Sequence, residues 1–209
     1  MPTLSLVDLA CRRGDRVLFK GVNLEVRAGC AVWLRGRNGR GKTSLLRLAC
    51  GLAVPESGRV LWGGVAVRRA AGYAEHRLYI GHANALKEDL TVMESLRFLA
   101  HLHGRPHDAH SLAAALARVG MASRRDAPVR TLSQGQRRRA ALARLALERQ
   151  AALWILDEPY DALDVDGIAC VNELLHEHLA RRGSVLLTSH LPPGAAAPEM
   201  VEIDLDPFA

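Results

Sequence analysis

One eight-residue segment limits the fold of this chain more than any other feature. Residues 36–43 read Gly-Arg-Asn-Gly-Arg-Gly-Lys-Thr, which fits the spacing G-x-x-x-x-G-K-[ST]; an apolar run precedes them and a helical pattern follows. Glycines at these positions let backbone N–H groups close around phosphate oxygens, and the start of a helix adds positive potential. The segment therefore predicts a phosphate-binding loop between a strand and a helix.

The side chains of this loop predict a site for a nucleoside triphosphate and its metal ion. Lys42 is placed to reach the β- and γ-phosphates, and the hydroxyl of Thr43 is placed to bind Mg²⁺. Lysines occur only at Lys20, Lys42 and Lys87 among the 28 basic residues, so a lysine at the motif position is not expected by chance. The predicted nucleotide-binding residues of the loop are Gly36, Arg37, Asn38, Gly39, Arg40, Gly41, Lys42, Thr43 and Ser44.

A strand that ends in two carboxylates is the second candidate element of this site. Residues 153–156 are apolar, and Asp157 and Glu158 follow them directly. Asp157 suits Mg²⁺ binding, directly or through water, and Glu158 suits the polarisation of a water molecule that attacks the γ-phosphate. Taken alone, such a strand could simply end in two solvated acids. The phosphate-binding loop favours the catalytic interpretation, because each motif accounts for the other.

The spacing of apolar residues predicts an α/β fold. Alternation predicts strands near 4–9, 22–26 and 60–62, and short apolar runs predict strands over 31–34, 153–156 and 185–188. Helical spacing predicts helices over 42–52, 91–102, 111–119, 134–148 and 164–179. Strands and helices in alternation favour a mostly parallel sheet. We expect one domain over residues 1–209, with a helical subdomain inserted at about 86–130.

A third motif connects these elements to a known family. Residues 131–139 read Thr-Leu-Ser-Gln-Gly-Gln-Arg-Arg-Arg, and Ser133 can cap the helix that follows, leaving the amides of Gly135 and Gln136 to meet an anion. With the other two motifs in this order, the chain resembles the ATP-binding cassette family, whose signature reads LSGGQ followed by basic residues. The resemblance implies that this signature serves the nucleotide held by a partner cassette. Its residues here are Leu132, Ser133, Gln134, Gly135 and Gln136.

The resemblance covers essentially the whole chain and implies further roles. Residues 161–164 stand at the D-loop of the family, and His190 stands at its switch histidine, where an imidazole could contact the γ-phosphate. Glu158 and His190 are therefore the predicted catalytic residues. The implied fold is the P-loop ATPase domain of this family, with an N-terminal antiparallel β subdomain and an inserted helical subdomain. The implied substrate is ATP, and the implied cofactor is Mg²⁺.

Three positions depart from the usual pattern of the family. Arg13 stands where most cassettes place an aromatic residue on the adenine; a guanidinium can stack on a base, and Phe19 is the alternative. Gln134 replaces the first glycine of the signature pair. His82 replaces the glutamine that usually links the nucleotide site to the membrane subunit, and its imidazole can still donate and accept hydrogen bonds. The candidate residues on the Mg²⁺ side are Thr43, Asp157 and His82.

Other segments narrow the resemblance. The short chain, Ile80-Gly81-His82, residues 153–159 and residues 164–167 together resemble the haem exporter ATP-binding subunit of bacterial cytochrome c maturation. That resemblance implies haem-linked export, an integral membrane partner, an ATP-dependent dimer of cassettes and a peripheral location on the cytoplasmic face of the inner membrane. The alternatives are a cassette ATPase for another exported substrate, or a non-transport cassette that acts on nucleic acid or ribosomes.

Composition adds further expectations. The formal net charge of +6 permits contact with phosphates, nucleic acid or an anionic membrane, but aromatic residues make up only 4%, which leaves few stacking platforms for single strands. Arg137 to Arg139 are interpreted as a solvated face of the signature helix or as groups beside the γ-phosphate, so no nucleic-acid partner is expected. The four cysteines form no CxxC pair and are expected to be reduced.

Overall fold

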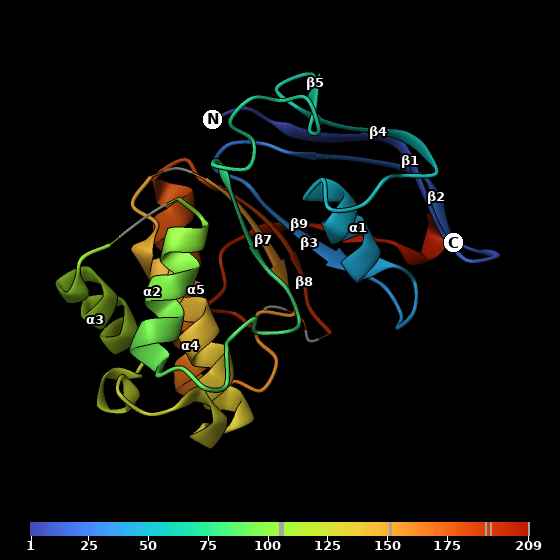
Figure 1. Ribbon diagram of the computed structural model, residues 1–209. Helices are drawn as coiled ribbons and strands as arrows, with labels where there is room; N and C mark the ends of the chain where they lie inside the picture. The colour runs from blue at the N-terminus through green and yellow to red at the C-terminus, as the bar shows by residue number, and fades with distance from the viewer. Residues whose placement is uncertain (105–106, 151, 191, 193, 209) are drawn as a thin grey trace.

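Two β-sheets and two helical layers make up the computed structural model, which describes residues 1–104, 107–150, 152–190, 192 and 194–208 (Figure 1). The antiparallel sheet has the order β2-β1-β4-β5, and the parallel sheet has the order β6-β7-β8-β3-β9. The strands are β1 (Leu4–Arg13), β2 (Arg16–Val26), β3 (Ala31–Arg35), β4 (Ser57–Trp62), β5 (Val65–Ala66), β6 (Arg77–Ile80), β7 (Leu153–Asp157), β8 (Ser184–Thr188) and β9 (Met200–Asp204). The α-helices are α1 (Lys42–Ala49), α2 (Val92–Leu102), α3 (Ala109–Arg118), α4 (Gln134–Leu147) and α5 (Val165–Ala180).

The parallel sheet separates two hydrophobic cores. Because side chains alternate along a strand, Leu153 and Ile155 of β7 face one core while Trp154 and Leu156 face the other. The first core contains α1 and the antiparallel sheet, and the second contains apolar residues of α2, α3, α4 and α5. Figure 1 shows these four helices together on one side of β7, with α1 on the other side. Both faces of β7 are buried, which explains its uninterrupted apolar sequence.

The structure confirms the predicted α/β class and the type of each predicted element, with differences at the ends. Helix α1 stops at Ala49, not at Leu52, because Gly51 adopts a left-handed φ of 70°. The short strands β5, β6 and β9 were not predicted. Strand β6 contains a tyrosine and an arginine, and its residues alternate between buried and half-buried positions, so its apolar signal is weak. The proposed limits of the inserted helical subdomain stay a prediction.

Helices α2 to α5 begin at side-chain caps that the sequence provides. Thr91 caps α2 and Ser133 caps α4, each in a reciprocal arrangement with the side chain three residues later. Asp108 and Asp164 cap α3 and α5 by accepting a backbone N–H in the first turn. Among the described residues, no helix has both the length and the apolar character that a membrane span requires.

Candidate nucleotide site

The candidate site lies where the parallel strands end. The carboxyl ends of β3, β6, β7 and β8 are followed by the segments that begin at Gly36, Gly81, Glu158 and Ser189, so the topology brings four separate parts of the sequence to one edge of the sheet. A cavity of about 330 Å³ opens there. It is lined by Arg13, Leu18, Arg37, Asn38, Gly39, Gly41, Lys42, Thr43, Ser44, His82, Asp157, Glu158 and His190.

The loop at 36–43 has the compact form that its glycines permit. Gly41 has a φ of 96°, and a Cβ atom there would lie 3.0 Å from Leu18 and 3.1 Å from the ring of Phe19. Lys42 is 8% exposed, and its Nζ donates a hydrogen bond to the carbonyl of Gly36 at 2.6 Å, which holds the ammonium group across the loop. The first backbone N–H groups of α1 and this ammonium group therefore present hydrogen-bond donors and positive charge to phosphate oxygens.

Asp157 lies on the cavity wall at the position predicted for the metal ion. Its Oδ1 accepts hydrogen bonds from the hydroxyls of Thr43 at 3.2 Å and Thr188 at 2.9 Å. Thr188 is the direct neighbour of Asp157 in the register of β7 and β8. The other oxygen, Oδ2, is buried and has no hydrogen-bond partner among the residues that the structure describes. A buried, unpartnered carboxylate oxygen beside a threonine hydroxyl fits the oxygen ligands that Mg²⁺ prefers, so these residues could hold the metal ion of a bound nucleotide.

Glu158 is fixed in an unusual backbone conformation. Its φ of 51° lies in the left-handed region, and its N–H donates to the hydroxyl of Thr188 at 3.0 Å. The side chain is 11% exposed, and its Oε2 accepts the backbone N–H of His190 at 2.8 Å. The Nε2 atom of His190 lies 3.4 Å from Oε1. The two predicted catalytic residues are therefore in direct contact, with the carboxylate of Glu158 on the cavity wall.

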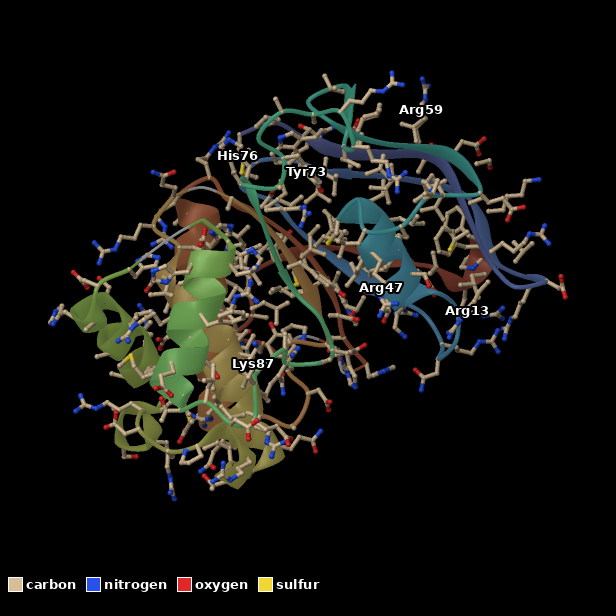
Figure 2. All side chains as sticks on the ribbon, viewed as in Figure 1. Arg13, Arg47, Arg59, Tyr73, His76 and Lys87 are labelled. Atoms are coloured by element: carbon tan, nitrogen blue, oxygen red, sulfur yellow. The ribbon has the colours of Figure 1, made fainter. Side chains whose placement is uncertain are left out.

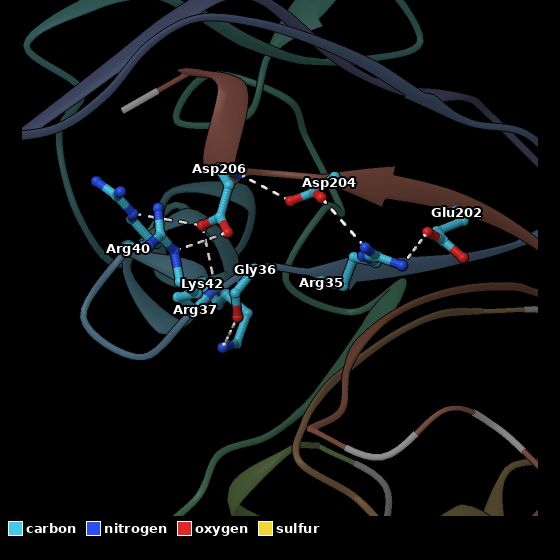
Figure 3. Close-up of polar contacts among 8 residues, drawn as sticks. All are labelled: Arg35, Gly36, Arg37, Arg40, Lys42, Glu202, Asp204 and Asp206. Atoms are coloured by element: carbon cyan, nitrogen blue, oxygen red, sulfur yellow. Dashed lines mark hydrogen bonds and ion pairs between the residues drawn. The ribbon is translucent and has the colours of Figure 1, made fainter.

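A carboxylate from the C-terminal segment supports the loop from outside the cavity (Figure 3). Asp206 accepts the backbone N–H of Arg37 at 3.0 Å and pairs with the guanidinium groups of Arg37 at 3.1 Å and Arg40 at 3.3 Å. The N–H of Arg37 is the main reason that the pKa of Asp206 is lowered from its ordinary value. Arg35, one residue before the loop, pairs with Glu202 and Asp204 on strand β9. No local pattern in the sequence indicates this role of Asp206, because its partners lie about 170 residues away in the chain.

Most of the predicted site residues meet at the cavity. Arg13 and His82 are exposed and line it, together with Asp157, Glu158, His190 and most of the loop. Of the predicted nucleotide-binding residues, Gly36 and Arg40 do not line it. Figure 2 shows Arg13 on the same side of the molecule as the loop before α1. Phe19, the alternative to Arg13 for contact with a base, is fully buried and does not line the cavity. Leu18 does line it, although nothing in the sequence singled it out.

The signature residues lie apart from this cavity. Ser133 and Gln136 form a reciprocal cap, in which the Gln136 N–H donates to the Ser133 hydroxyl at 3.2 Å and the Ser133 N–H donates to the Gln136 side chain at 3.1 Å. A Cβ atom on Gly135 would lie 2.6 Å from the carbonyl oxygen of Ala162. Arg139 pairs with Asp164. The signature helix is thus packed against the segment at 161–164, and none of residues 132–136 lines the cavity of its own chain.

One prediction about the signature helix is wrong. Arg138 is not on a solvated face or beside a phosphate; it is 3% exposed and points into the protein. A signal for this exists in the sequence, since Arg138, Leu142 and Leu145 have the spacing of one helix face and the two leucines are buried.

Comparisons with known proteins agree with this geometry. The family model described as ABC transporter matches residues 19–161. The "Cytochrome c biogenesis ATP-binding export protein CcmA" of Aromatoleum aromaticum is 47% identical over 100% of this chain and 97% of its own, and the protein of that name from Salmonella typhi is 48% identical over 90% of each chain. A solved structure, the "Putative ABC transporter (ATP-binding protein) from Pyrococcus furiosus", has the same fold, with a TM-score of 0.84 at 24% identity over 99% of each chain. The chain therefore belongs to the ABC transporter family of ATPases, in the group of cytochrome c biogenesis ATP-binding export proteins.

Proposed function

We propose that this chain binds ATP with Mg²⁺ in the cavity at the loop 36–43 and hydrolyses it. The observation that carries the proposal is the side chain of Asp157 at the cavity wall. Two threonine hydroxyls hold one of its oxygens, and the other oxygen is buried with no hydrogen-bond partner in the described part of the chain. Such an arrangement leaves one carboxylate oxygen uncompensated unless a cation or its water shell approaches. Mg²⁺, when bound, would neutralise charge on the β- and γ-phosphates.

Different residues of the chain bind the nucleotide and promote its hydrolysis in this proposal. Lys42 and the amides of the loop bind the phosphates, and Arg13 lies at the cavity rim, where its guanidinium can stack on the base. The oxygen of the attacking water bonds to the γ-phosphorus, and the carboxylate of Glu158 accepts a proton from that water. The bond between the γ-phosphorus and the β-phosphate oxygen breaks in the same step. His190 orients that carboxylate through its backbone N–H and places its imidazole at the same wall. His82 also lines a second pocket, together with residues of α2 and α4.

We further infer that hydrolysis drives an integral membrane subunit in an export step of cytochrome c biogenesis, linked to haem. The names of the relatives support the export step, and the haem link rests on the resemblance of residues 80–82, 153–159 and 164–167. In this proposal the chain is peripheral on the cytoplasmic face of the inner membrane. The signature residues lie outside their own cavity, which supports a two-fold dimer in which each chain closes the other's site over ATP.

Nucleotide binding and hydrolysis by three variants test the proposal. Lys42→Ala should weaken the binding of a fluorescent ATP analogue, because it removes a positive charge from the phosphate-binding loop. Glu158→Gln should keep binding and lower hydrolysis about 100- to 10,000-fold, the range for loss of a general base. Lys20→Ala, an exposed lysine away from the cavity, is the matched control and should change neither quantity. Wild-type turnover in Glu158→Gln would refute its role.

The export step needs a test in cells. A bacterium that lacks its own subunit of this type should regain haem-containing c-type cytochromes when it expresses the wild-type chain, and not when it expresses Glu158→Gln. Co-purification of the chain with a hydrophobic membrane protein is expected; co-purification with RNA instead would support the non-transport alternative. Restored cytochromes with the Glu158→Gln variant would show that hydrolysis is not needed for this step.

A further inference from the structure

Arg138 is a buried cation that the proposed catalytic steps do not use. It lies in the second turn of α4, five residues after the capping Ser133, and only 3% of its surface is exposed. Burial of a guanidinium is costly unless its donors are satisfied, so its partners need to be accounted for. Burial also lowers the pKa of this arginine, while the charges of Asp161, Asp157 and Glu158 act in the opposite direction.

The two terminal nitrogens of Arg138 each donate to two acceptors. Nη2 donates to the backbone carbonyls of Asp157 at 2.7 Å and Glu158 at 2.8 Å. Nη1 donates to the carbonyl of Gly81 at 2.9 Å and to the Oδ1 atom of Asn84 at 3.1 Å. One planar group on the signature helix thus joins the end of β7 to the segment that contains His82.

The contact with Glu158 is the one with a catalytic consequence. The backbone of this residue has a φ of 51°, a conformation that an L-residue adopts only when its surroundings hold it there. Thr188 holds its N–H and Arg138 holds its carbonyl, so the peptide groups on both sides of its Cα are fixed. These two contacts set the direction in which the side chain leaves the backbone, and the N–H of His190 then holds its Oε2 atom.

We propose that Arg138 is a positioning residue for hydrolysis: its guanidinium holds the backbone of Glu158 and the segment 81–84 in one arrangement with the signature helix. The inference rests on the proposed function of Glu158 as the base. A lysine cannot replace the guanidinium, because a single ammonium cannot reach two pairs of acceptors in one plane. A displacement of about 1 Å in a catalytic group can cost about 100-fold in rate, so the loss should appear in kcat.

Arg138→Lys is the main test, in the chain co-purified with its membrane subunit. We expect kcat for Mg-ATP to fall roughly 10- to 100-fold. The Kd of a fluorescent ATP analogue should stay within about twofold of wild type, because the substitution does not change the phosphate-binding loop. Arg137→Lys is the matched control. Arg137 is the neighbouring arginine on α4 and pairs with Glu88 on the surface, so this change should leave both quantities unchanged.

A double variant separates positioning from a general loss of structure. If Arg138 acts through Glu158, adding Arg138→Lys to Glu158→Gln should lower the residual rate no further. Additive losses, or a wild-type kcat in Arg138→Lys, would overturn the inference, as would an increase in Kd with kcat unchanged. If Arg138→Lys does not fold, Asn84→Ala replaces it as the test. Removal of this one acceptor should lower kcat by a smaller factor, and adding it to Glu158→Gln should lower the residual rate no further. An unchanged kcat in Asn84→Ala would overturn the inference. Wild-type hydrolysis by Glu158→Gln alone would instead overturn the proposed function.

Discussion

The stability of this protein should fall in mild acid because of one buried histidine. His178 lies in α5 and is 0% exposed; its ring stacks on Trp154 with centroids 3.7 Å apart, and its Nε2 donates to the carbonyl of Ala152 at 2.8 Å. Burial lowers the pKa of His178 from 6.5 to about 4, and the charge of Arg181 acts in the same direction. The folded protein therefore holds this imidazole neutral at pH values where an unfolded chain would protonate it.

The sign and size of the effect follow from these two pKa values. Between pH 6.5 and pH 4 the unfolded state binds more protons than the folded state, so the free energy of unfolding decreases as the pH falls through this window. For pKa values of 6.5 and about 4, the loss between pH 7.5 and pH 5 is about 2 kcal/mol. That is a large part of the 5–15 kcal/mol roughly typical of a folded domain.

Urea unfolding at pH 7.5 and pH 5 measures this loss. His178→Phe keeps a ring against Trp154 but cannot titrate. It should be less stable at pH 7.5, because the carbonyl of Ala152 keeps the N–H of Ser184 but loses the donor from the imidazole, and its stability should depend less on pH by about 2 kcal/mol. His176→Gln, an exposed histidine on the same helix, is the control and should behave as wild type. An equal pH dependence in wild type and His178→Phe would refute the reasoning.

Three further predictions concern the nucleotide site. Asp206→Ala should raise the Kd for ATP several-fold with little effect on kcat, because the phosphate loop loses its external support, whereas Glu202→Gln, which affects only Arg35, should not; equal Kd values in the two variants would exclude this support. Glu158→Gln with ATP and Mg²⁺ should sediment as a dimer and Ser133→Arg should prevent this, so an ATP-independent monomer of Glu158→Gln would count against shared sites. His82→Ala should reduce stimulation by the membrane subunit more than basal hydrolysis, and a basal loss as large as that of Glu158→Gln would make His82 catalytic.

Local signals were sufficient to predict most of the fold. The loop at 36–43, the apolar strand at 153–156 and the capped helix after Ser133 each have a pattern within ten residues, and each has the predicted form in the structure. The edge strand β9 has no such pattern, because residues 200–204 are half-buried or exposed and its pairing with β3 is set by distant residues. Weak alternation at a sheet edge does not distinguish a strand from a loop.

The difference between local patterns and contacts set by distant residues also applies to the site. Lys42, Asp157 and Glu158 have roles that their own motifs predict, since the chemistry depends on residue type and on the neighbouring strand or helix. Asp206 and Arg138 have roles that depend on contacts across 169 and 20 residues of sequence, respectively. No local pattern specifies such a contact: the helical spacing of Arg138 with Leu142 and Leu145 indicates a buried face, but it does not indicate which backbone carbonyls the guanidinium meets.

The glutamine in the signature shows how a departure from a family pattern can be neutral in structure. Gln134 is exposed and begins α4 in a helical conformation, which any L-residue adopts, so no contact within the described part of its own chain requires a glycine there. Gly135 is different, because a Cβ atom there would lie 2.6 Å from the carbonyl oxygen of Ala162, a backbone atom that cannot move aside without displacing the segment 161–164. The close contact between the signature helix and that segment therefore requires the second glycine and not the first.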